Sequence, residues 1–202
     1  MITYQDQDGL RVITINRPDK ANSLTKAMLE QLCDVTRDPG DAQAVIITGK
    51  GRVFSAGADL EEARAGLATD DVWERLSGNI AALPCLTIAA LNGTLAGGAF
   101  GMALACDIRL SVPEAKFFYP VMKLGFLPQP SDPKRMSALI GPARTKFILM
   151  GGQKITSDQA YQFGLIDQII TGDALIAHAN ELCADAIAAD SNIHHKIKSL
   201  CS

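Results

Sequence analysis

The sequence predicts an α/β fold, because segments typical of buried strands alternate with segments typical of helices. Residues 10–16 and 44–48 are short runs, β-branched or continuously apolar, as expected of strands that helices cover. A third strand is predicted over residues 86–91, and the glycine-rich residues 92–98 that follow it lead into an apolar helix. We therefore expect a domain built from repeated β-β-α or β-α-β units.

The other elements follow from capping residues and helix breakers. Thr25 is suited to cap a helix over residues 26–36, and Pro84 ends a helix over residues 71–83. Further helices are expected from Leu60 and over 134–139, 143–150, 157–163 and 174–189, further strands over 107–111 and 115–118, a strand or extended connection over 165–170, and loops over 49–59 and 121–133.

The composition and net charge argue against nucleic acid and membranes as partners. The chain has 202 residues, is 48% hydrophobic and 20% charged, and carries a net charge of -3. This is ordinary for one globular domain, and nucleic acid is not expected as a partner because a basic surface is missing. The apolar runs are too short to span a bilayer, so no membrane partner is expected. The first ten residues lack a basic region followed by an apolar one, so a cytoplasmic location is expected.

Cysteine and histidine usage argues against a metal site or a disulfide framework. The five cysteines are an odd number and include no C-x-x-C pair, which favours reduced, structural thiols. All three histidines fall within the last 25 residues. The rest of the chain therefore has no histidine to act as a general base or metal ligand.

Two glycine-rich turns, at residues 54–60 and 91–100, share one pattern: a strand, a turn of small residues, and the start of a helix. Backbone N–H groups at a helix start lack partners within the helix. Two such groups that converge would form a pocket for an oxyanion, whereas neither turn has the spacing of a phosphate-binding motif. The alternative is that both turns are only tight connections. The spacing of Gly93, Gly97 and Gly101 would place these glycines on one helical face if the helix begins early.

With these segments in view, the chain resembles the crotonase, or enoyl-CoA hydratase/isomerase, superfamily from residue 12 to about residue 200. The motifs that carry the resemblance are ITINRPDKANSL, VIITGKGRVFSAGADL, AALNGTLAGGAFGMALACDIRL, KFFYPVMKLGFLP, LIGPAR and GGQKITSDQAYQFGLIDQII. The resemblance implies a spiral of ββα units, usually assembled as trimers or dimers of trimers. It also implies a core over residues 1–190, with 191–202 starting a C-terminal helical segment that is mostly lacking. In the family that segment covers the active site and completes trimer contacts.

The resemblance implies an acyl-CoA substrate and no bound cofactor. The family polarises a thioester carbonyl with two backbone N–H groups so that an enolate can form, and the matching donors here are those of Ala58 and Gly98. Lys20 either contacts coenzyme A or is a solvated surface lysine. The substrate contacts that the motifs imply are Lys20, Ala21, Ala56, Asp59, Leu60, Gly97 and Gln129.

The departures from the family pattern concern the acids. Two glutamates position and deprotonate water in the family's hydratases, and the matching residues here are Gly101 and Val121. A third position, acidic in some isomerases and a dehalogenase of the family, is Gln129. Asp132 is the nearest carboxylate in sequence, and either acts in the pocket or caps the following helix. Tyr119 either offers its hydroxyl to the pocket or packs in the core.

Two functions stay open on these residues. The first is an enzyme of fatty acid metabolism that works through an enolate. Isomerisation, decarboxylation or thioester hydrolysis is favoured over efficient hydration, because a positioned acid or base accelerates a reaction by about 10²–10⁴-fold and the two glutamates are replaced. The second is a non-catalytic acyl-CoA-binding or assembly subunit. A homo-oligomer is expected in either case.

Overall fold

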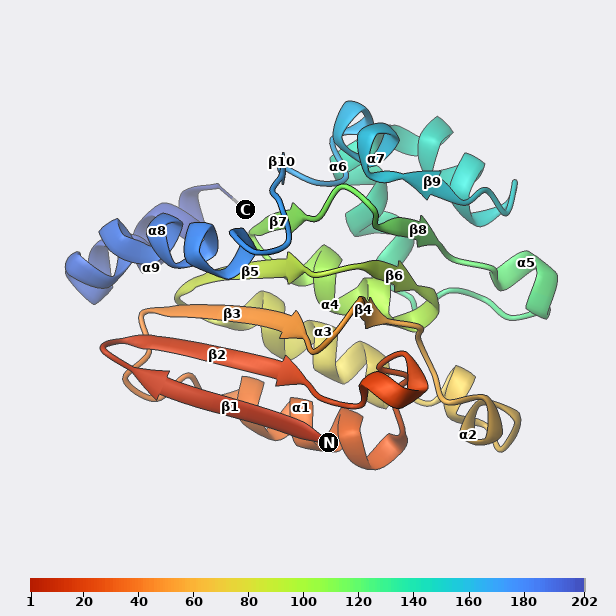
Figure 1. The fold of residues 1–202 in the computed structure, drawn as a ribbon, viewed down its shortest axis with the longest axis horizontal. Helices are drawn as coiled ribbons and strands as arrows, with labels where there is room; N and C mark the ends of the chain where they lie inside the picture. Colours follow the sequence, from red (N-terminus) through yellow and green to blue (C-terminus); the bar gives the residue numbers. More distant parts are fainter. Residues whose placement is uncertain (202) are drawn as a thin grey trace.

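The larger of two sheets has six strands in the order β1-β2-β3-β5-β7-β10, in a computed structural model that describes residues 1–201 (Figure 1). Neighbouring strands are parallel, except that β1 is antiparallel to β2. The strands are β1 (Ile2–Gln7), β2 (Leu10–Ile15), β3 (Ala44–Gly49), β5 (Leu86–Leu91), β7 (Ile108–Ser111) and β10 (Gln168–Ile169).

Strand β1 is an element that the sequence pattern does not predict. Five of its six residues are exposed, so it carries no apolar signal. It is held as an edge strand by a hairpin through Asp8 and Gly9, whose φ angles are 50° and 81°. Two central residues with positive φ define the type I′ turn, for which Asp-Gly is a favoured pair.

A smaller sheet is formed by four strands in the order β4-β6-β8-β9, of which only β9 is antiparallel to its neighbour. Its strands are β4 (Val53–Ser55), β6 (Thr94–Ala96), β8 (Lys116–Phe118) and β9 (Ile155–Thr156). Figure 1 shows the chain passing from the larger sheet to the smaller one three times, from β3 to β4, from β5 to β6 and from β7 to β8. Helices follow each passage, which confirms the spiral of ββα units.

Gly93 marks one of these passages. A β-carbon at Gly93 would lie only 2.0 Å from the Arg52 carbonyl oxygen, so only glycine fits where the two chain segments cross. The expectation that Gly93, Gly97 and Gly101 share a helical face is wrong. Gly93 precedes β6, and Gly97 begins the short 3-10 helix η3 (Gly97–Ala99), so that only Gly101 lies in helix α4 (Phe100–Ala105).

The longer helices flank the sheets. Figure 1 shows α1 (Lys26–Arg37) and α3 (Val72–Ala82) behind the larger sheet, where α1 packs on α3 and α3 on α4. Helix α8 (Leu175–Ala188) packs against β3, β5 and β7. The remaining elements are η1 (Pro18–Lys20), α2 (Leu60–Arg64), η2 (Leu67–Thr69), α5 (Val121–Leu124), α6 (Asp132–Leu149), α7 (Ser157–Phe163) and α9 (Ser191–Leu200).

Two of these helices refine the predicted boundaries. Helix α6 is interrupted at Gly141, whose φ and ψ are 78° and 160°, and Pro142 follows. The interruption agrees with the two separate helices expected over 134–139 and 143–150. Helix α5 lies within the segment 121–133 that was expected to be a loop, and it is too short to leave a periodic pattern.

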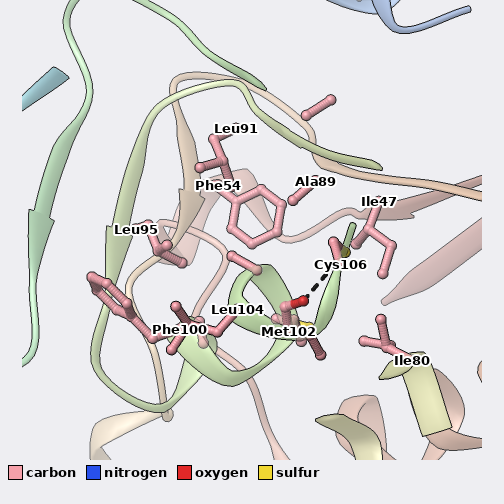
Figure 2. Packing of buried hydrophobic residues seen from close by; sticks show 14 of the residues in the cluster. Ile47, Phe54, Ile80, Ala89, Leu91, Leu95, Phe100, Met102, Leu104 and Cys106 are labelled. Carbon is pink, nitrogen blue, oxygen red and sulfur yellow. Dashed lines mark hydrogen bonds between the residues drawn. The ribbon is translucent and has the colours of Figure 1, made fainter. Parts of the chain in front are cut away.

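The core beneath the glycine turns is continuous. Figure 2 shows Phe54, Leu91, Leu95 and Phe100 packed together, and every residue of α4 is buried. Because Phe54, Leu91, Leu95 and all of α4 are buried, the strand side of the first turn and both sides of the second turn are fixed by core packing. Four cysteines are buried and Cys201 is exposed, and all five are free thiols, as expected. Within residues 1–201 no helix is both long and apolar enough to cross a bilayer.

Candidate active site

The two glycine turns predicted to act together are in direct contact. Gly57 has a φ of 89° and Gly97 a φ of 58°, both in the left-handed region that favours glycine. A β-carbon at Gly57 would lie 2.9 Å from the Ala96 carbonyl oxygen. The backbones can approach this closely only without side chains. As a result, Ala58 and Gly98 line the same cavity.

The hydrogen bonds around Ala58 are made by its neighbours. Ala58 forms an isolated bridge with Leu24, in which Leu24 N–H donates to Gly57 O and Asp59 N–H donates to Leu24 O, each at 2.8 Å. Gly57 N–H donates to Ser55 Oγ at 3.1 Å. The Ala58 N–H itself donates to no acceptor among residues 1–201.

Gly98 also has an N–H group at the start of a helix. It is the second residue of η3, where an N–H has no partner within the helix, and no side chain caps this end. The indole of Trp73 covers Gly98, since a β-carbon there would lie 3.2 Å from Trp73 Cδ2. Trp73 is fixed in turn by its Nε1–H, which donates to Leu67 O at 2.8 Å.

Two cavities of different character meet at this point. The first, about 500 Å³, is called the polar cavity because most of its lining residues are polar or charged, Arg17, Lys20 and Asp59 among them. The second, about 220 Å³, is apolar. Both are lined by Ala56, Ala58 and Leu60, so they adjoin at the predicted thioester position.

In the first cavity the main ion pair joins Arg17 and Asp59. Arg17 Nη1 donates to Asp59 Oδ2 at 2.7 Å and to Ser23 Oγ at 3.1 Å. The bond from Arg17 is the main reason that the pKa of Asp59 is lowered. Asp59 also caps α2, because its Oδ1 accepts from Glu61 N–H at 3.1 Å. Arg17 was not predicted as a site residue, although it lies three residues before Lys20.

The other predicted contacts in this region differ in their placement. Lys20 and Leu60 are exposed at the first cavity, Leu60 with 73% of its surface. Ala21 is not among the described residues that line either cavity. Its carbonyl instead accepts from Ala56 N–H at 3.0 Å and so holds the wall of the cavity in place.

The second cavity contains no charged side chain among its described lining residues. Gln129 is buried there, and its Nε2–H donates to Ala68 O at 3.4 Å. Val121, which the resemblance matches to a hydratase glutamate, lines the same cavity. Leu124, Phe126 and Leu127 also line this cavity but were not predicted as site residues; the signal for them in the sequence is a group of apolar residues in an expected loop.

Tyr119 and Asp132 are joined behind this cavity. Tyr119 lines the cavity, stacks on Phe100 with ring centroids 5.4 Å apart, and is only 4% exposed. Its hydroxyl donates to Asp132 Oδ2 at 3.0 Å and accepts from Gln129 N–H at 3.4 Å. Tyr119 therefore both packs in the core and reaches the pocket.

Asp132 does not cap the helix that follows it, contrary to one of the two predicted roles. It is the first residue of α6, the cap position is Ser131, and no side chain caps that end. The Asp132 side chain is fully buried and its Oδ1 has no partner among the described residues. Burial raises the pKa of Asp132 to about 7, Glu74 adds to the shift, and the Tyr119 hydrogen bond and Arg135 oppose it. No cluster that could hold a metal occurs within residues 1–201.

Comparison with known proteins supports the sequence interpretation. The family model for enoyl-CoA hydratase/isomerase matches residues 5–201. YngF of Bacillus subtilis, provisionally named an enoyl-CoA hydratase/isomerase, is 35% identical over 196 residues, covering 92% of this chain and 75% of YngF.

Solved structures show the same fold. An enoyl-CoA hydratase/carnithine racemase from Magnetospirillum magneticum, also provisionally named, superposes with a TM-score of 0.92 at 28% identity, covering 100% of this chain and 81% of that one. A protein from Thermobifida fusca, provisionally named an enoyl-CoA hydratase and solved in complex with CoA, has a TM-score of 0.90 at 25% identity, covering 99% of this chain and 83% of that one. On the match over residues 5–201, the chain belongs to the enoyl-CoA hydratase/isomerase family.

Proposed function

We propose that this protein is an enzyme that binds an acyl-CoA thioester and stabilises its enolate with the N–H groups of Ala58 and Gly98. The observation that carries the proposal is the pair of cavities that adjoin at Ala56, Ala58 and Leu60. A polar cavity beside an apolar one suits a substrate with a charged carrier at one end and a hydrocarbon at the other. The Thermobifida fusca relative solved with CoA supports this choice of ligand.

The coenzyme A part of the substrate is assigned to the first cavity. Among its lining residues, Arg17 and Lys20 are the two cations that would contact the phosphates of coenzyme A, beside the carboxylates of Asp59, Glu61 and Glu62. Ala56, Asp59 and Leu60 line that side of the site, and the Ala21 carbonyl holds Ala56 in place from outside the cavity. The acyl group fits the second cavity, between Gly97 and Gln129.

Two N–H donors aimed at the thioester oxygen would favour any reaction that passes through an enolate. Each such donor typically contributes ~2.7–4 kcal/mol of transition-state stabilisation. Val121 and the glycine at position 101 supply no carboxylate to activate water, so isomerisation, decarboxylation or thioester hydrolysis is favoured over hydration. Tyr119, which donates a hydrogen bond to Asp132, is the one titratable side chain among the described residues that line the second cavity; burial, together with Asp132, raises the pKa of its hydroxyl.

A second candidate function is a non-catalytic acyl-CoA-binding or assembly subunit. The uncharged lining of the second cavity favours it, because the cavity holds no carboxylate or histidine of the usual catalytic kinds. Tyr119, which does line the cavity, is the feature that favours an enzyme.

A panel of substrates distinguishes the two. Purified protein is incubated with crotonyl-CoA, vinylacetyl-CoA, malonyl-CoA and butyryl-CoA. Loss or gain of enoyl absorbance, release of CO₂ or appearance of free thiol would identify the reaction. Binding of these esters by calorimetry without turnover would support the binding subunit. No binding of any ester would overturn both functions.

The same family membership leads us to propose a cytoplasmic homo-oligomer, with residues 1–190 as the acyl-CoA-binding core and 191–202 as the start of a C-terminal segment. Ile193, Ile197 and Leu200 of α9 are each more than half exposed, which suits a helix face that is covered in an assembly. Light scattering on the purified protein measures the oligomeric state directly.

A further inference from the structure

Gly101 and Asp132 adjoin each other next to Tyr119, which lines the second cavity. A β-carbon at Gly101 would lie 3.1 Å from Asp132 Oδ1 and 3.5 Å from Ser77 Cβ. Gly101 lies within α4, so its backbone conformation does not require glycine. A side chain at position 101 would meet the carboxyl group of Asp132, so glycine at this position leaves room for that group.

The surroundings of that carboxyl group do not favour a permanent negative charge. Its Oδ2 receives one hydrogen bond, from Tyr119, and its Oδ1 receives none among the described residues. Arg135 of α6 directs its Nη1 to Ser77 Oγ at 2.9 Å and to Ser131 Oγ at 2.6 Å. A buried carboxylate with so few donors is costly, so a proton is readily taken up.

A second acidic group faces the same region from α3. Glu74 Oε2 accepts from Ser131 N–H at 3.2 Å and from Ser131 Oγ–H at 3.0 Å. Its negative charge and the positive charge of Arg135 act on Asp132 in opposite directions. Glu74, Arg135 and Tyr119 are therefore the charged and titratable groups that influence Asp132 from α3, α6 and the segment after β8.

The protonation state of Asp132 decides where the Tyr119 proton points. When Asp132 is ionised, the Tyr119 hydroxyl donates to its Oδ2. When Asp132 is protonated, the carboxyl can donate to the Tyr119 oxygen, which also accepts from Gln129 N–H. The Tyr119 proton is then free to point into the cavity that Tyr119 shares with Gly98.

We propose that Tyr119 and Asp132 form a proton relay in which Tyr119 meets the substrate carbon and Asp132 stores the proton. This inference rests on the proposed function. In the forward step a C–H bond of the acyl group breaks and its proton moves to the Tyr119 oxygen. The Tyr119 proton moves to Asp132 Oδ2, and the electron pair of the C–H bond enters the enolate. The reverse step returns a proton to carbon, re-forms the thioester carbonyl and leaves Asp132 as a carboxylate.

Hydrogen exchange tests the relay without assuming the overall reaction. Butyryl-CoA is incubated with the protein in D₂O, and uptake of deuterium at the α-carbon is followed by mass spectrometry while binding is measured by calorimetry. Because the carboxylate form accepts the proton, exchange by the wild-type protein should rise with pH through about 7 and then level off. Tyr119→Phe should lower the exchange rate by about 10²–10⁴-fold with little change in butyryl-CoA affinity.

Asp132→Asn keeps the shape of the side chain and should slow the exchange while removing its pH dependence. Gly101→Ala leaves Asp132 and Tyr119 in the chain but crowds the carboxyl group, and should also slow the exchange. Gly78→Ala is the matched control, because a β-carbon at Gly78 meets nothing within 4 Å. Thermal melting of each variant checks that it is folded.

The outcomes separate the relay from the proposed function. Wild-type rates and pH profile in folded Tyr119→Phe or Asp132→Asn protein would overturn the relay but leave the enolate chemistry standing. Binding of butyryl-CoA by wild-type protein without any exchange would also overturn the relay and would favour the binding subunit. Failure of the wild-type protein to bind butyryl-CoA or any other ester of the panel would overturn the proposed function itself.

Discussion

The backbones of Gly57 and Gly97 are in direct contact: a β-carbon built on Gly97 would be 3.7 Å from Gly57 Cα, and one built on Gly57 would be 3.4 Å from Gly97 Cα. The two residues are 40 positions apart and belong to different turns of the spiral. Their contact is what joins the two strand-to-helix junctions and brings Ala58 and Gly98 to one cavity.

Gly57→Ala should therefore separate the two turns. The new β-carbon would meet the Ala96 carbonyl oxygen at 2.9 Å, in addition to the strain of a positive φ. Gly152→Ala is the control, since its φ is 61° but nothing lies within 4 Å of its β-carbon. We expect Gly57→Ala to be less stable than this control by about 1–3 kcal/mol in urea denaturation. Equal stability of the two variants would show that the turns can separate freely.

Gly98→Pro should remove one donor to the thioester oxygen. Gly98→Ala is the matched variant, because its β-carbon presses on Trp73 in the same way while its N–H is kept. We expect turnover in Gly98→Pro to be lower than in Gly98→Ala by about 10²–10³-fold, with a much smaller difference in CoA-ester binding. Equal losses of turnover and binding would argue against this N–H as a donor.

Val121→Glu should not restore hydration. The new carboxylate would enter the apolar cavity, but position 101 would still lack its glutamate partner. Met122→Glu is a control with the same charge change at a neighbouring residue that is 62% exposed. Both variants should fail to hydrate crotonyl-CoA when absorbance is followed. Rapid hydration by Val121→Glu would show that one carboxylate is sufficient.

Asp132 should make the stability of the protein depend on pH. Its pKa is about 7 in the folded chain, above the ~3.9 of an unfolded aspartate. Folding therefore favours the protonated form of Asp132. The stability that this proton adds to the folded protein is fully present below pH ~3.9 and is lost as the pH rises through about 7. A shift of this size corresponds to roughly 4 kcal/mol as an upper limit.

Asp132→Asn should remove that dependence. The free energy of unfolding, measured by urea denaturation, should differ less between pH 5 and pH 8 for the variant than for the wild-type protein. At pH 8 the variant should be more stable than the wild-type protein. Asp158→Asn, at an exposed residue of α7, serves as the control. An unchanged difference between the two pH values would show that Asp132 titrates in its ordinary range.

Local patterns in the chain were sufficient to predict most strands of the larger sheet, the longer helices, the break of α6 at Gly141 and Pro142, and the two glycine turns, whereas the short strands β4, β6 and β9 of the smaller sheet were not predicted. These features depend on apolar periodicity and on backbone freedom, which neighbouring residues determine. Strand β1 escaped prediction because an exposed edge strand needs no apolar face.

The pairing of Tyr119 with Asp132 could not be inferred from spacing, and neither could the use of Gly101 to make room for that carboxyl group. They depend on β8, α4 and the start of α6 meeting at one place, which is determined by packing between elements distant in the chain. The meeting of a polar and an apolar cavity at Ala58 has the same origin. A sequence encodes the local preferences of each segment, whereas burial and electrostatic surroundings arise only when the segments pack together.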